Sequence, residues 1–383
     1  MADRSPVIVG IGLSDHPKAP HLDARQHHAQ AMRRALDDAG LSIKDVDGYC
    51  NADQKLPDIA EYLGIRHRYI DGTSLGGSSF EFFVQHAAAA IRAGYADTVL
   101  VTYGSDQLSR RGRTLGTGGT NLGEPSTWAQ YEAPYGNPLV GAYAMAARRH
   151  MHEFGTTSEQ LAEIAVGVRE FAAFNPNAQY RDPLTVDDVL SSRMIADPLH
   201  KLDCCVISDG GAAFVMTTVE RARDLRRPPV HVLGAAAAQT HWNIGQMPDF
   251  TTTAAAQAGP EAFAQAGLTP ADVDMVMLYD SFTITCLLLL ESLGFVKRGE
   301  GGPFAAEGHL RRGGSLPMNT DGGGLSALHP GMRGAFLIVE AVRQLRGEAG
   351  EVQVPNCEVA LASGSGGWLS TMGVTILGKE PRR

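Results

Sequence analysis

The chain has 383 residues, of which 44% are hydrophobic and 20% are charged, and its formal net charge is -9. This composition is typical of a globular protein with a large core. The acidic balance, without any long run of Lys or Arg, argues against nucleic acid and against an anionic membrane surface as partners. The longest purely apolar runs, such as Leu287–Leu290, are far too short to span a bilayer.

The cysteine content predicts neither a disulfide framework nor a structural zinc site. Five cysteines are few for a chain of this length, and no two are spaced as C-x-x-C. The N-terminal segment MADRSPVIVGIGLSD has no apolar stretch of signal-peptide length. We therefore expect a cytoplasmic protein. Adjacent cysteines on a strand point to opposite faces, so we interpret Cys204 and Cys205 as structural.

The sequence predicts alternating strands and helices in the first half of the chain. Gly40 and Gly94 are expected to end two of the helices. A loop insertion is expected at about 106–200, with glycine-rich loops at 110–123. The predicted strands are 7–12, 46–50, 98–103, 203–208 and 212–217, and the predicted helices are 24–40, 80–94, 140–154 and 157–173.

The second half repeats this plan after Pro228 and Pro229, which mark a boundary near 225–230. Alternating helices and buried strands predict an α/β protein with a mostly parallel sheet covered on both faces. The repeat predicts two similar halves, 1–225 and 226–383. The predicted strands are 231–234, 273–278, 358–361 and 373–377, and the predicted helices are 259–268, 283–294 and 334–347.

The predicted strand 273–278 ends in the polar stretch Tyr279, Asp280, Ser281. Strand ends in α/β folds often carry functional side chains. Tyr279 could act as an acid or base at the mouth of a pocket, with Asp280 orienting its neighbour. Alternatively, both side chains could simply satisfy nearby backbone groups, and the pattern alone favours neither interpretation.

Three glycine-rich stretches are candidates for ligand contact. NTDGGGLSALHP (319–330) places His329 after a glycine triplet, where the imidazole could act as a base or hydrogen-bond donor, although a lone histidine is more often structural. SGSGG (363–367) follows a predicted strand and could form an oxyanion hole or a plain turn. TSLGGSSF (73–80) begins a helix, where an anion or nucleophile would be stabilised, but it contains no cysteine.

Several stretches, matched in this order, resemble the thiolase superfamily and most of all its sterol-carrier-protein branch. The resemblance covers almost the whole chain. It implies a five-layered αβαβα fold, a homodimer, acyl-CoA substrates and carbon–carbon chemistry beside the thioester carbonyl, with no metal and no cofactor apart from the coenzyme A of the substrate. The matching stretches are DCCVISDGGAA (203–213), LYDSFTITCLLLLESLGF (278–295), NTDGGGLSALHPGMRG (319–334) and EAVRQLRG (340–347).

The two cysteines that thiolases use are absent in this reading. The nucleophile at the start of the buried helix falls near Gly77, next to Ser78. The acid/base cysteine of the branch's His-Asp-Cys-Phe motif falls on Ser281 of Tyr-Asp-Ser-Phe, whereas the histidine of the Gly-His-Pro-like motif is kept as His329. Without the first cysteine no acyl-enzyme can form, so the ping-pong Claisen reaction is not expected.

Steroid side-chain aldolases of the family resemble this chain in lacking both cysteines and in carrying a tyrosine at Tyr279. They imply an aldol or retro-aldol step on a β-hydroxyacyl-CoA and a small OB-fold/zinc-ribbon partner protein. They differ in having a second tyrosine where this chain has His329. A condensing acyltransferase and a non-catalytic acyl-CoA-binding subunit therefore remain alternatives. The implied catalytic residues are Tyr279, His329 and Asp280, and the implied oxyanion or substrate-binding residues are Gly77, Ser78, Ser281, Gly366 and Gly367.

Overall fold

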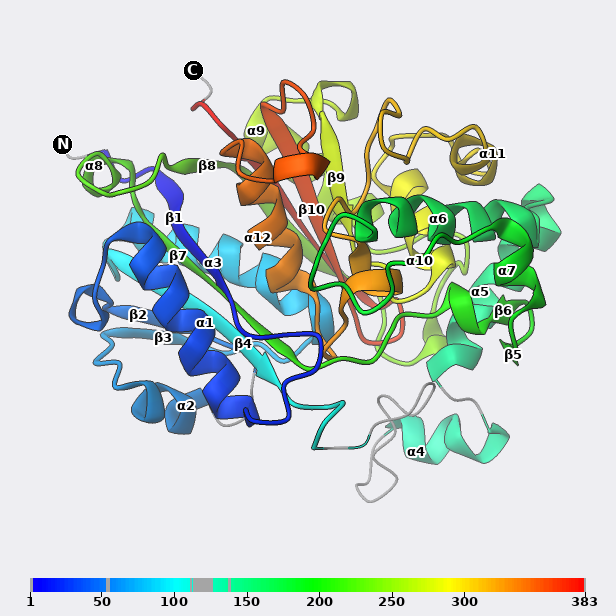
Figure 1. The fold of residues 1–383 in the computed structure, drawn as a ribbon, viewed down its shortest axis with the longest axis horizontal. Helices are drawn as coiled ribbons and strands as arrows, with labels where there is room; N and C mark the ends of the chain where they lie inside the picture. The colour runs from blue at the N-terminus through cyan, green and yellow to red at the C-terminus, as the bar shows by residue number, and fades with distance from the viewer. Residues whose placement is uncertain (1–2, 53–55, 111, 113–126, 137–138, 382–383) are drawn as a thin grey trace.

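The structure is a computed structural model that describes residues 3–52, 56–110, 112, 127–136 and 139–381. Nine strands form its main sheet, in the order β3-β2-β4-β7-β1-β8-β11-β10-β9 (Figure 1). Two short strands, β5 (Met194–Ala196) and β6 (Leu199–His200), form a separate ribbon. The main strands are β1 (Pro6–Leu13), β2 (Gly48–Cys50), β3 (Tyr69–Asp71), β4 (Thr98–Ser105), β7 (Gly210–Thr218), β8 (Val230–Gln239), β9 (Met275–Leu278), β10 (Val359–Gly366) and β11 (Thr371–Gly378).

The prediction of a mostly parallel sheet is wrong. Strand β2 pairs in parallel with β3 and β4, and β9 pairs in parallel with β10, but the remaining neighbours in the main sheet are antiparallel. Between β10 and β11 the connection is short, whereas a parallel crossover needs a dozen or more residues. These two strands therefore form a hairpin.

The helices follow the expected order, and local sequence explains their ends. Helix α1 begins after Asp23, whose carboxylate accepts a hydrogen bond from the backbone N–H of Gln26, and it ends at Gly40 with a left-handed φ of 74°. The longer helices are α1 (Ala24–Ala39), α2 (Leu56–Leu63), α3 (Ser79–Ala93), α5 (Leu139–Phe154), α6 (Ser158–Ala172), α9 (Ala255–Ala266), α10 (Thr283–Ser292) and α12 (Gly334–Leu345). The shorter ones are α4 (Thr127–Tyr131), α7 (Val186–Ser191), α8 (Val219–Ala222) and α11 (Gly301–Ala306).

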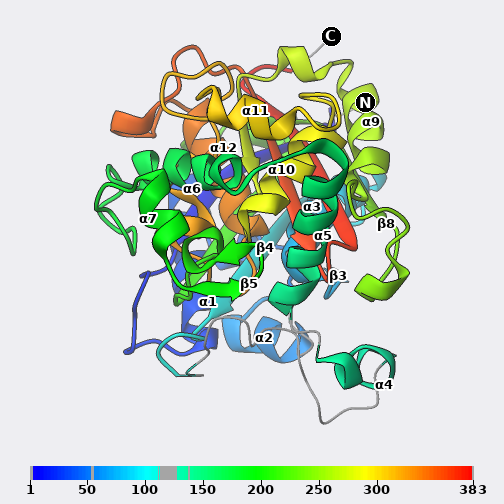
Figure 2. The same cartoon turned by 90° about the vertical axis from the view of Figure 1, so that its right-hand side faces the viewer.

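Helices α3 and α12 form a central layer, because each contacts strands from both halves of the chain (Figures 1 and 2). Helix α1 packs on β1, β4 and β7, and α9 packs on β8 and β11. This order of layers, helix, strand, helix, strand, helix, is the expected five-layered αβαβα fold. Helices α5, α6 and α7 lie together on one side of the molecule, at the right in Figure 1.

Several local predictions need correction. The predicted strand at 203–208 is a short 3₁₀ turn, Lys201–Asp203, followed by extended chain, because the Asp203 carboxylate bonds the backbone N–H of His200 at 2.8 Å. Strand β10 runs on to Gly366 instead of ending before SGSGG. Helix α2 and strand β3 were not predicted. Residues 113–126, which include most of the predicted glycine-rich loop, lie outside the described residues. The division near 225 stays a prediction, since β1 and β8 join both halves in one sheet.

Candidate active site

Tyr279 directly follows β9 and is buried, with 4% of its surface exposed. Its backbone N–H donates to the carbonyl of Ser363 on β10, so the sheet fixes where the side chain starts. The phenol oxygen lies 3.0 Å from Nε2 of His329, and it donates a longer bond of 3.4 Å to the carbonyl of Gly331. The two rings meet edge to face, with centroids 5.5 Å apart. The structure thus brings together two predicted catalytic residues that are fifty positions apart.

The space for the Tyr279 ring comes from a glycine. An ideal Cβ at Gly77 would lie 1.9 Å from Cε2 of Tyr279 and 2.6 Å from its hydroxyl oxygen. No side chain fits at such a distance, so any residue other than glycine at position 77 would displace the phenol. Gly77 belongs to the 3₁₀ turn Gly76–Ser78 that leads into α3. The predicted nucleophile position is therefore part of the phenol's binding surface.

His329 is held through its backbone and that of the residues after it. Its N–H donates to Ser208 Oγ at 3.0 Å, and its carbonyl accepts a bond of 2.6 Å from Gln107 Nε2. The Tyr103 hydroxyl donates to the carbonyl of Pro330 at 2.6 Å and accepts from the N–H of Met332 at 3.1 Å. These contacts fix the imidazole relative to Tyr279. Sequence reasoning missed the support that these three side chains give to His329, because none of them lies near Tyr279 or His329 in the sequence, although Ser208 belongs to the matched stretch 203–213.

The Asp280 carboxylate contacts the glycine-rich stretch after residue 319. It accepts hydrogen bonds from the backbone N–H groups of Gly324 at 2.8 Å and Leu325 at 3.1 Å. An ideal Cβ at Gly323 would lie 2.1 Å from its Oδ2. The glycine triplet therefore accommodates the protein's own carboxylate, whereas the sequence suggested that its amides would approach a ligand. The sequence left two interpretations of Asp280 open. Its contacts agree with the one in which the side chain satisfies nearby backbone groups.

A buried guanidinium completes this arrangement. Arg333 is fully buried, forms an ion pair of 3.2 Å with Asp280, and donates bonds of 2.6 and 2.7 Å to the carboxylate of Asp321. Burial raises the pKa of Asp280, and the positive charge of Arg333 opposes this rise. Asn319 anchors the start of the same stretch, because its side-chain amide exchanges two bonds of 2.8 Å with the backbone of Leu278. The stretch that carries His329 is thus tied to the strand that carries Tyr279.

The remaining predicted residues lie in the turn before α3, just after β9 and at the end of β10. Gly76–Ser78 packs against the end of β10, where an ideal Cβ at Gly366 would lie 1.6 Å from the carbonyl oxygen of Leu75. The Ser78 hydroxyl is 2.8 Å from Thr371 Oγ1, and the Ser281 hydroxyl is 3.0 Å from Thr285 Oγ1. Gly367 follows β10 with a left-handed φ of 61°. Their roles in binding an oxyanion stay predictions.

The phenol of Tyr279 is protonated at neutral pH. Burial raises its pKa well above the ordinary value, and interactions with Cys205, Tyr143 and Tyr103 act in the same direction. A neutral phenol donates a hydrogen bond readily but is a poor base on its own. Because His329 Nε2 is within hydrogen-bonding distance, the phenol can accept a proton from a substrate while passing its own to the imidazole.

Two residues, Cys205 and Tyr143, were not assigned to the site from the sequence. Cys205 interacts electrostatically with Tyr279 and is only partly buried, and its backbone N–H donates to the carbonyl of Ser281. Tyr143 of α5 packs its ring on Phe282 with centroids 4.3 Å apart. The interpretation of Cys205 as structural stays a prediction. Tyr143 carries no sequence signal, because it lies within an ordinary amphipathic helix.

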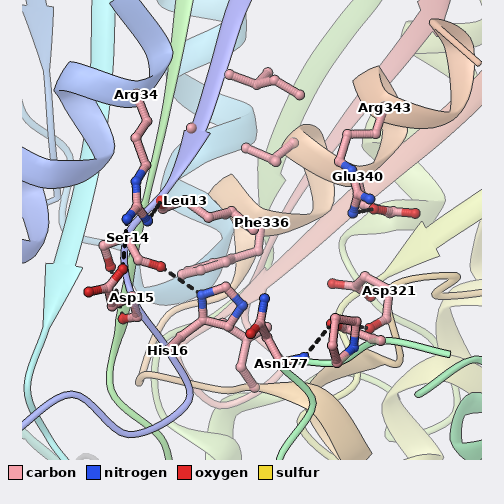
Figure 3. A pocket seen from close by; sticks show the side chains of 16 residues that line it. Leu13, Ser14, Asp15, His16, Arg34, Asn177, Asp321, Phe336, Glu340 and Arg343 are labelled. Carbon is pink, nitrogen blue, oxygen red and sulfur yellow. Dashed lines mark hydrogen bonds and ion pairs between the residues drawn. The ribbon is translucent and has the colours of Figure 1, made fainter. Parts of the chain in front are cut away.

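A cavity of about 520 Å³ lies between the end of β1 and α12 (Figure 3). Asp321, which pairs with Arg333, lines this cavity, whereas Asp280 does not. His16 projects into it and bonds the carbonyl of Ser14 at 2.7 Å. Tyr279 and His329 do not line this cavity. It is therefore distinct from the candidate active site.

Among the residues that the structure describes, no three His, Cys, Asp or Glu side chains are grouped so that they could bind a metal ion. Within that same part of the chain, no helix is both long enough and apolar enough to cross a bilayer.

Comparison with known proteins identifies the family. The family model "Thiolase C-terminal domain-like" matches residues 236–379. The chain is 37% identical to the "Steroid side-chain-cleaving aldolase" of Thermomonospora curvata, over 97% of each chain. It is 39% identical to the "17-hydroxy-3-oxo-4-pregnene-20-carboxyl-CoA lyase" of Mycobacterium tuberculosis, over 89% of this chain and 91% of that one. The solved structure "Ltp2-ChsH2(DUF35) aldolase" matches with a TM-score of 0.90 and 35% identity, covering 99% of this chain and 98% of that one.

The chain belongs to the thiolase superfamily. It resembles the steroid side-chain aldolases and the sterol-carrier-protein type, as the sequence motifs implied. An acetyl-CoA acetyltransferase of Methanothermobacter thermautotrophicus is also 33% identical, over 98% of this chain and 100% of that one. In this thiolase-superfamily member, the motifs place the two thiolase cysteine positions at Gly77 and Ser281, and the phenol of Tyr279 lies against Gly77.

Proposed function

We propose that this chain is an acyl-CoA lyase that cleaves a β-hydroxyacyl-CoA by a retro-aldol reaction. The observation that carries the proposal is the 3.0 Å contact between the Tyr279 hydroxyl and His329 Nε2, made in space that Gly77 leaves open. An acyl-enzyme mechanism would need a nucleophile at that position, and the phenol occupies it instead. The remaining chemistry is proton transfer and enolate stabilisation.

In the proposed reaction the Tyr279 oxygen takes the proton of the substrate's β-hydroxyl as its own proton passes to His329 Nε2. The bond between the α- and β-carbons then breaks, the β-carbon becomes a ketone, and the electron pair forms the enolate of a shorter acyl-CoA. We place the thioester carbonyl between Gly77 and Gly366–Gly367. Two glycine backbones meet there, since an ideal Cβ at Gly76 would lie 3.0 Å from Cα of Gly366. Backbone N–H groups would stabilise the oxyanion at this point.

For the substrate we propose the coenzyme A ester of a steroid side-chain acid. The lyase that shares 39% identity with this chain is named for such a substrate, and the aldolase that shares 37% identity is named for cleaving steroid side chains. The lyase's named substrate carries its hydroxyl β to the thioester carbonyl, as a retro-aldol reaction requires. We also propose that the chain is cytoplasmic and forms a homodimer that binds a partner of the DUF35 type, since a matching solved structure is an aldolase named for such a pair.

Condensation is the second candidate, because an acetyl-CoA acetyltransferase matches over nearly the full length. In that direction the same groups would work in reverse on a preformed enolate. The absence of a nucleophile at Gly77 favours cleavage, since an acyltransferase of the usual thiolase type forms an acyl-enzyme.

The test uses the chain purified as a complex with its natural partner. It is incubated with 17-hydroxy-3-oxo-4-pregnene-20-carboxyl-CoA, and the ketone and the shorter acyl-CoA are measured by mass spectrometry. We expect both products, and we expect Tyr279→Phe to lower kcat by about 10²–10⁴-fold, the usual contribution of general acid–base catalysis. Tyr95→Phe, which changes an exposed tyrosine at the end of α3, is the matched control. Wild-type turnover by Tyr279→Phe, or no ketone from the unmodified complex, would contradict the proposal.

A further inference from the structure

Trp242 lies beside the turn at which we place the thioester carbonyl. An ideal Cβ at Gly367 would lie 3.5 Å from Cζ3 of the indole, which is ordinary van der Waals contact. The same turn meets the start of α3, because an ideal Cβ at Gly76 would lie 3.2 Å from the backbone nitrogen of Gly367. Gly77, the next residue, lies against the ring of Tyr279. A series of close contacts thus leads from the phenol to the indole.

The indole is partly exposed although the segment that carries it is anchored at both ends. Trp242 is 43% exposed, whereas tryptophan side chains usually bury most of their surface. Before it, Nε2 of His241 lies 2.9 Å from the carbonyl oxygen of Trp368. After it, the N–H of Gly245 donates to Oε1 of Glu132 at 2.7 Å. The fold therefore holds a flat apolar ring at the surface beside the candidate active site.

A cavity of about 580 Å³ begins two residues further along the same segment. Ile244 lines one part of it, and Ala144 and Met145 of α5 line another. Tyr143, the residue before Ala144, packs its ring on Phe282 of the Tyr-Asp-Ser-Phe motif, with centroids 4.3 Å apart. Helix α5 therefore contacts both the cavity and the active-site motif.

The lining of this cavity suits an apolar ligand better than the nucleotide part of coenzyme A. Tyr131 and Tyr135, which are 67% and 88% exposed, contribute aromatic surface to it. Among the described residues that line it, Arg148 is the one cation, and its guanidinium pairs with Asp197. Phosphate groups need several donors or positive charges, so they would find little to bind here. A flat apolar ring system would instead be covered on several sides.

We propose that Trp242 and this cavity bind the steroid ring system of the substrate, an inference that rests on the proposed retro-aldol function. In the steroid ester named above, the β-carbon belongs to the ring system, so the rings begin where the Tyr279 hydroxyl acts. The thioester carbonyl lies at Gly367, beside the indole. The rings extend from this point across the exposed face of the indole, and the cavity receives their far end. Trp242 thus determines which acyl groups bind, while Tyr279 and His329 carry out the chemistry.

The binding of two coenzyme A esters tests this site without any bond cleavage. The first is the named steroid ester without its 17-hydroxyl group, which keeps the rings but has no proton for Tyr279 to remove. The second is propionyl-CoA, which has no rings. Isothermal titration calorimetry with the complex measures both dissociation constants. We expect Trp242→Ala to bind the steroid ester about tenfold more weakly and propionyl-CoA as tightly as the unmodified complex, because only the rings reach the indole.

Tyr62→Ala is the matched control, because it truncates an aromatic side chain of similar exposure, 48%, on α2. It should leave both dissociation constants unchanged. Met145→Gln is a second variant that keeps Trp242 and the length of the side chain on a partly exposed face of α5. It places an amide in the cavity wall, so the steroid ester should bind about threefold more weakly. This variant decides the matter if Trp242→Ala is unstable.

Equal weakening of both esters by Trp242→Ala would assign the indole to coenzyme A and overturn the proposal. Unchanged binding of the steroid ester by both variants would overturn it as well. Turnover of the hydroxylated ester separates this result from the retro-aldol function. A complex that shows the expected binding differences but does not cleave that ester keeps the ring site and refutes the cleavage reaction.

Discussion

Gly77 and Tyr279 occupy one site between them: the ring of the tyrosine fills the volume that any side chain at Gly77 would need. The phenol at the end of β9 therefore takes the space that the side chain of a nucleophile at the start of α3 would need. A thiolase cysteine and this tyrosine cannot share the site in this backbone. The chain is thereby committed to chemistry without an acyl-enzyme.

Gly77→Ala is expected to abolish cleavage while the fold survives. The new methyl group would lie 1.9 Å from Cε2 of Tyr279, so the phenol must move away from His329. We expect kcat to fall at least 10²-fold and the free energy of unfolding to fall by about 1–3 kcal/mol, as for other overpacked sites. Enzyme kinetics and denaturant unfolding measure the two effects.

Gly167→Ala is the control for that change. It adds the same methyl group within α6, where the nearest atom is the flexible Arg311 side chain at 3.3 Å. The variant should remain active and about as stable as the parent. In the double variant Gly77→Ala with Tyr279→Ala, part of the lost stability should return without activity, because the two side chains no longer compete. Full activity of Gly77→Ala would show that the phenol is not held where the structure places it.

Tyr103 should affect turnover without touching the substrate. Its hydroxyl bridges the carbonyl of Pro330 and the N–H of Met332, directly after His329. Tyr103→Phe removes both bonds, so the imidazole loses part of its support and the free energy of unfolding falls by about 1 kcal/mol. We expect kcat to fall about tenfold with a smaller change in KM. Tyr62→Phe on the exposed face of α2 should change neither constant, and an equal result for Tyr103→Phe would contradict a positioning role.

The sequence located the two central residues but not the contacts that support them. The strand before Tyr279 and the glycines before His329 are local patterns, so their motifs could be recognised without a structure. That both side chains meet follows from the pairing of β9 with β10 and from Asn319, which ties the stretch after Met318 to Leu278. Such long-range pairing leaves no mark in local periodicity.

The same limit explains two misinterpretations. A glycine triplet suggests close backbone approach, and the sequence cannot say whether the approaching group is a ligand or an internal side chain such as Asp280. The SGSGG stretch suggests a turn, yet its first four residues continue β10 and the turn begins only at Gly367; the glycine at 364 makes room for Glu81, since a Cβ there would lie 2.0 Å from Oε2 of that residue. At both positions the glycine leaves room for a side chain of the same protein, Asp280 or Glu81, that is distant in the sequence.

Asp280→Asn should test whether this carboxylate is chiefly structural. The side chain is fully buried, pairs with Arg333, and accepts two backbone hydrogen bonds from Gly324 and Leu325. Asparagine keeps the shape but offers one acceptor where two donors converge, and it removes the charge opposite Arg333. We expect the free energy of unfolding to fall by about 3–5 kcal/mol, as for other broken buried pairs.

Urea unfolding measures this loss, and Asp58→Asn provides the comparison. Asp58 forms an ion pair with Arg25 in which both side chains are 48% exposed. Exposed pairs contribute about 1 kcal/mol or less, so this variant should unfold almost like the parent. If Asp280→Asn were as stable as Asp58→Asn but lost much of its turnover, the result would show that Asp280 takes part in the reaction instead.

Glu81 in the first turn of α3 should make the fold more stable in acid than at neutral pH. The side chain is fully buried, and both carboxyl oxygens lack a hydrogen-bond partner within the described residues. Burial raises its pKa well above the usual value of 4.5. The folded chain therefore keeps a proton that the unfolded chain releases. This contribution to stability is complete below the unfolded pKa and is lost as the pH rises through the folded pKa.

Glu81→Gln removes this titration without changing the size of the side chain. The free energy of unfolding at pH 7 should therefore increase. The increase is about 1.4 kcal/mol for each unit by which the pKa of Glu81 in the folded chain exceeds its unfolded value, counted only up to pH 7. Its decline between pH 5 and pH 7 should become shallower than that of the parent. Denaturant unfolding at several pH values measures both, and the exposed Glu61→Gln on α2 should follow the parent curve. A Glu81→Gln curve that runs parallel to the parent, or below it at pH 7, would mean that Glu81 is ionised in the folded chain and stabilised by its charge.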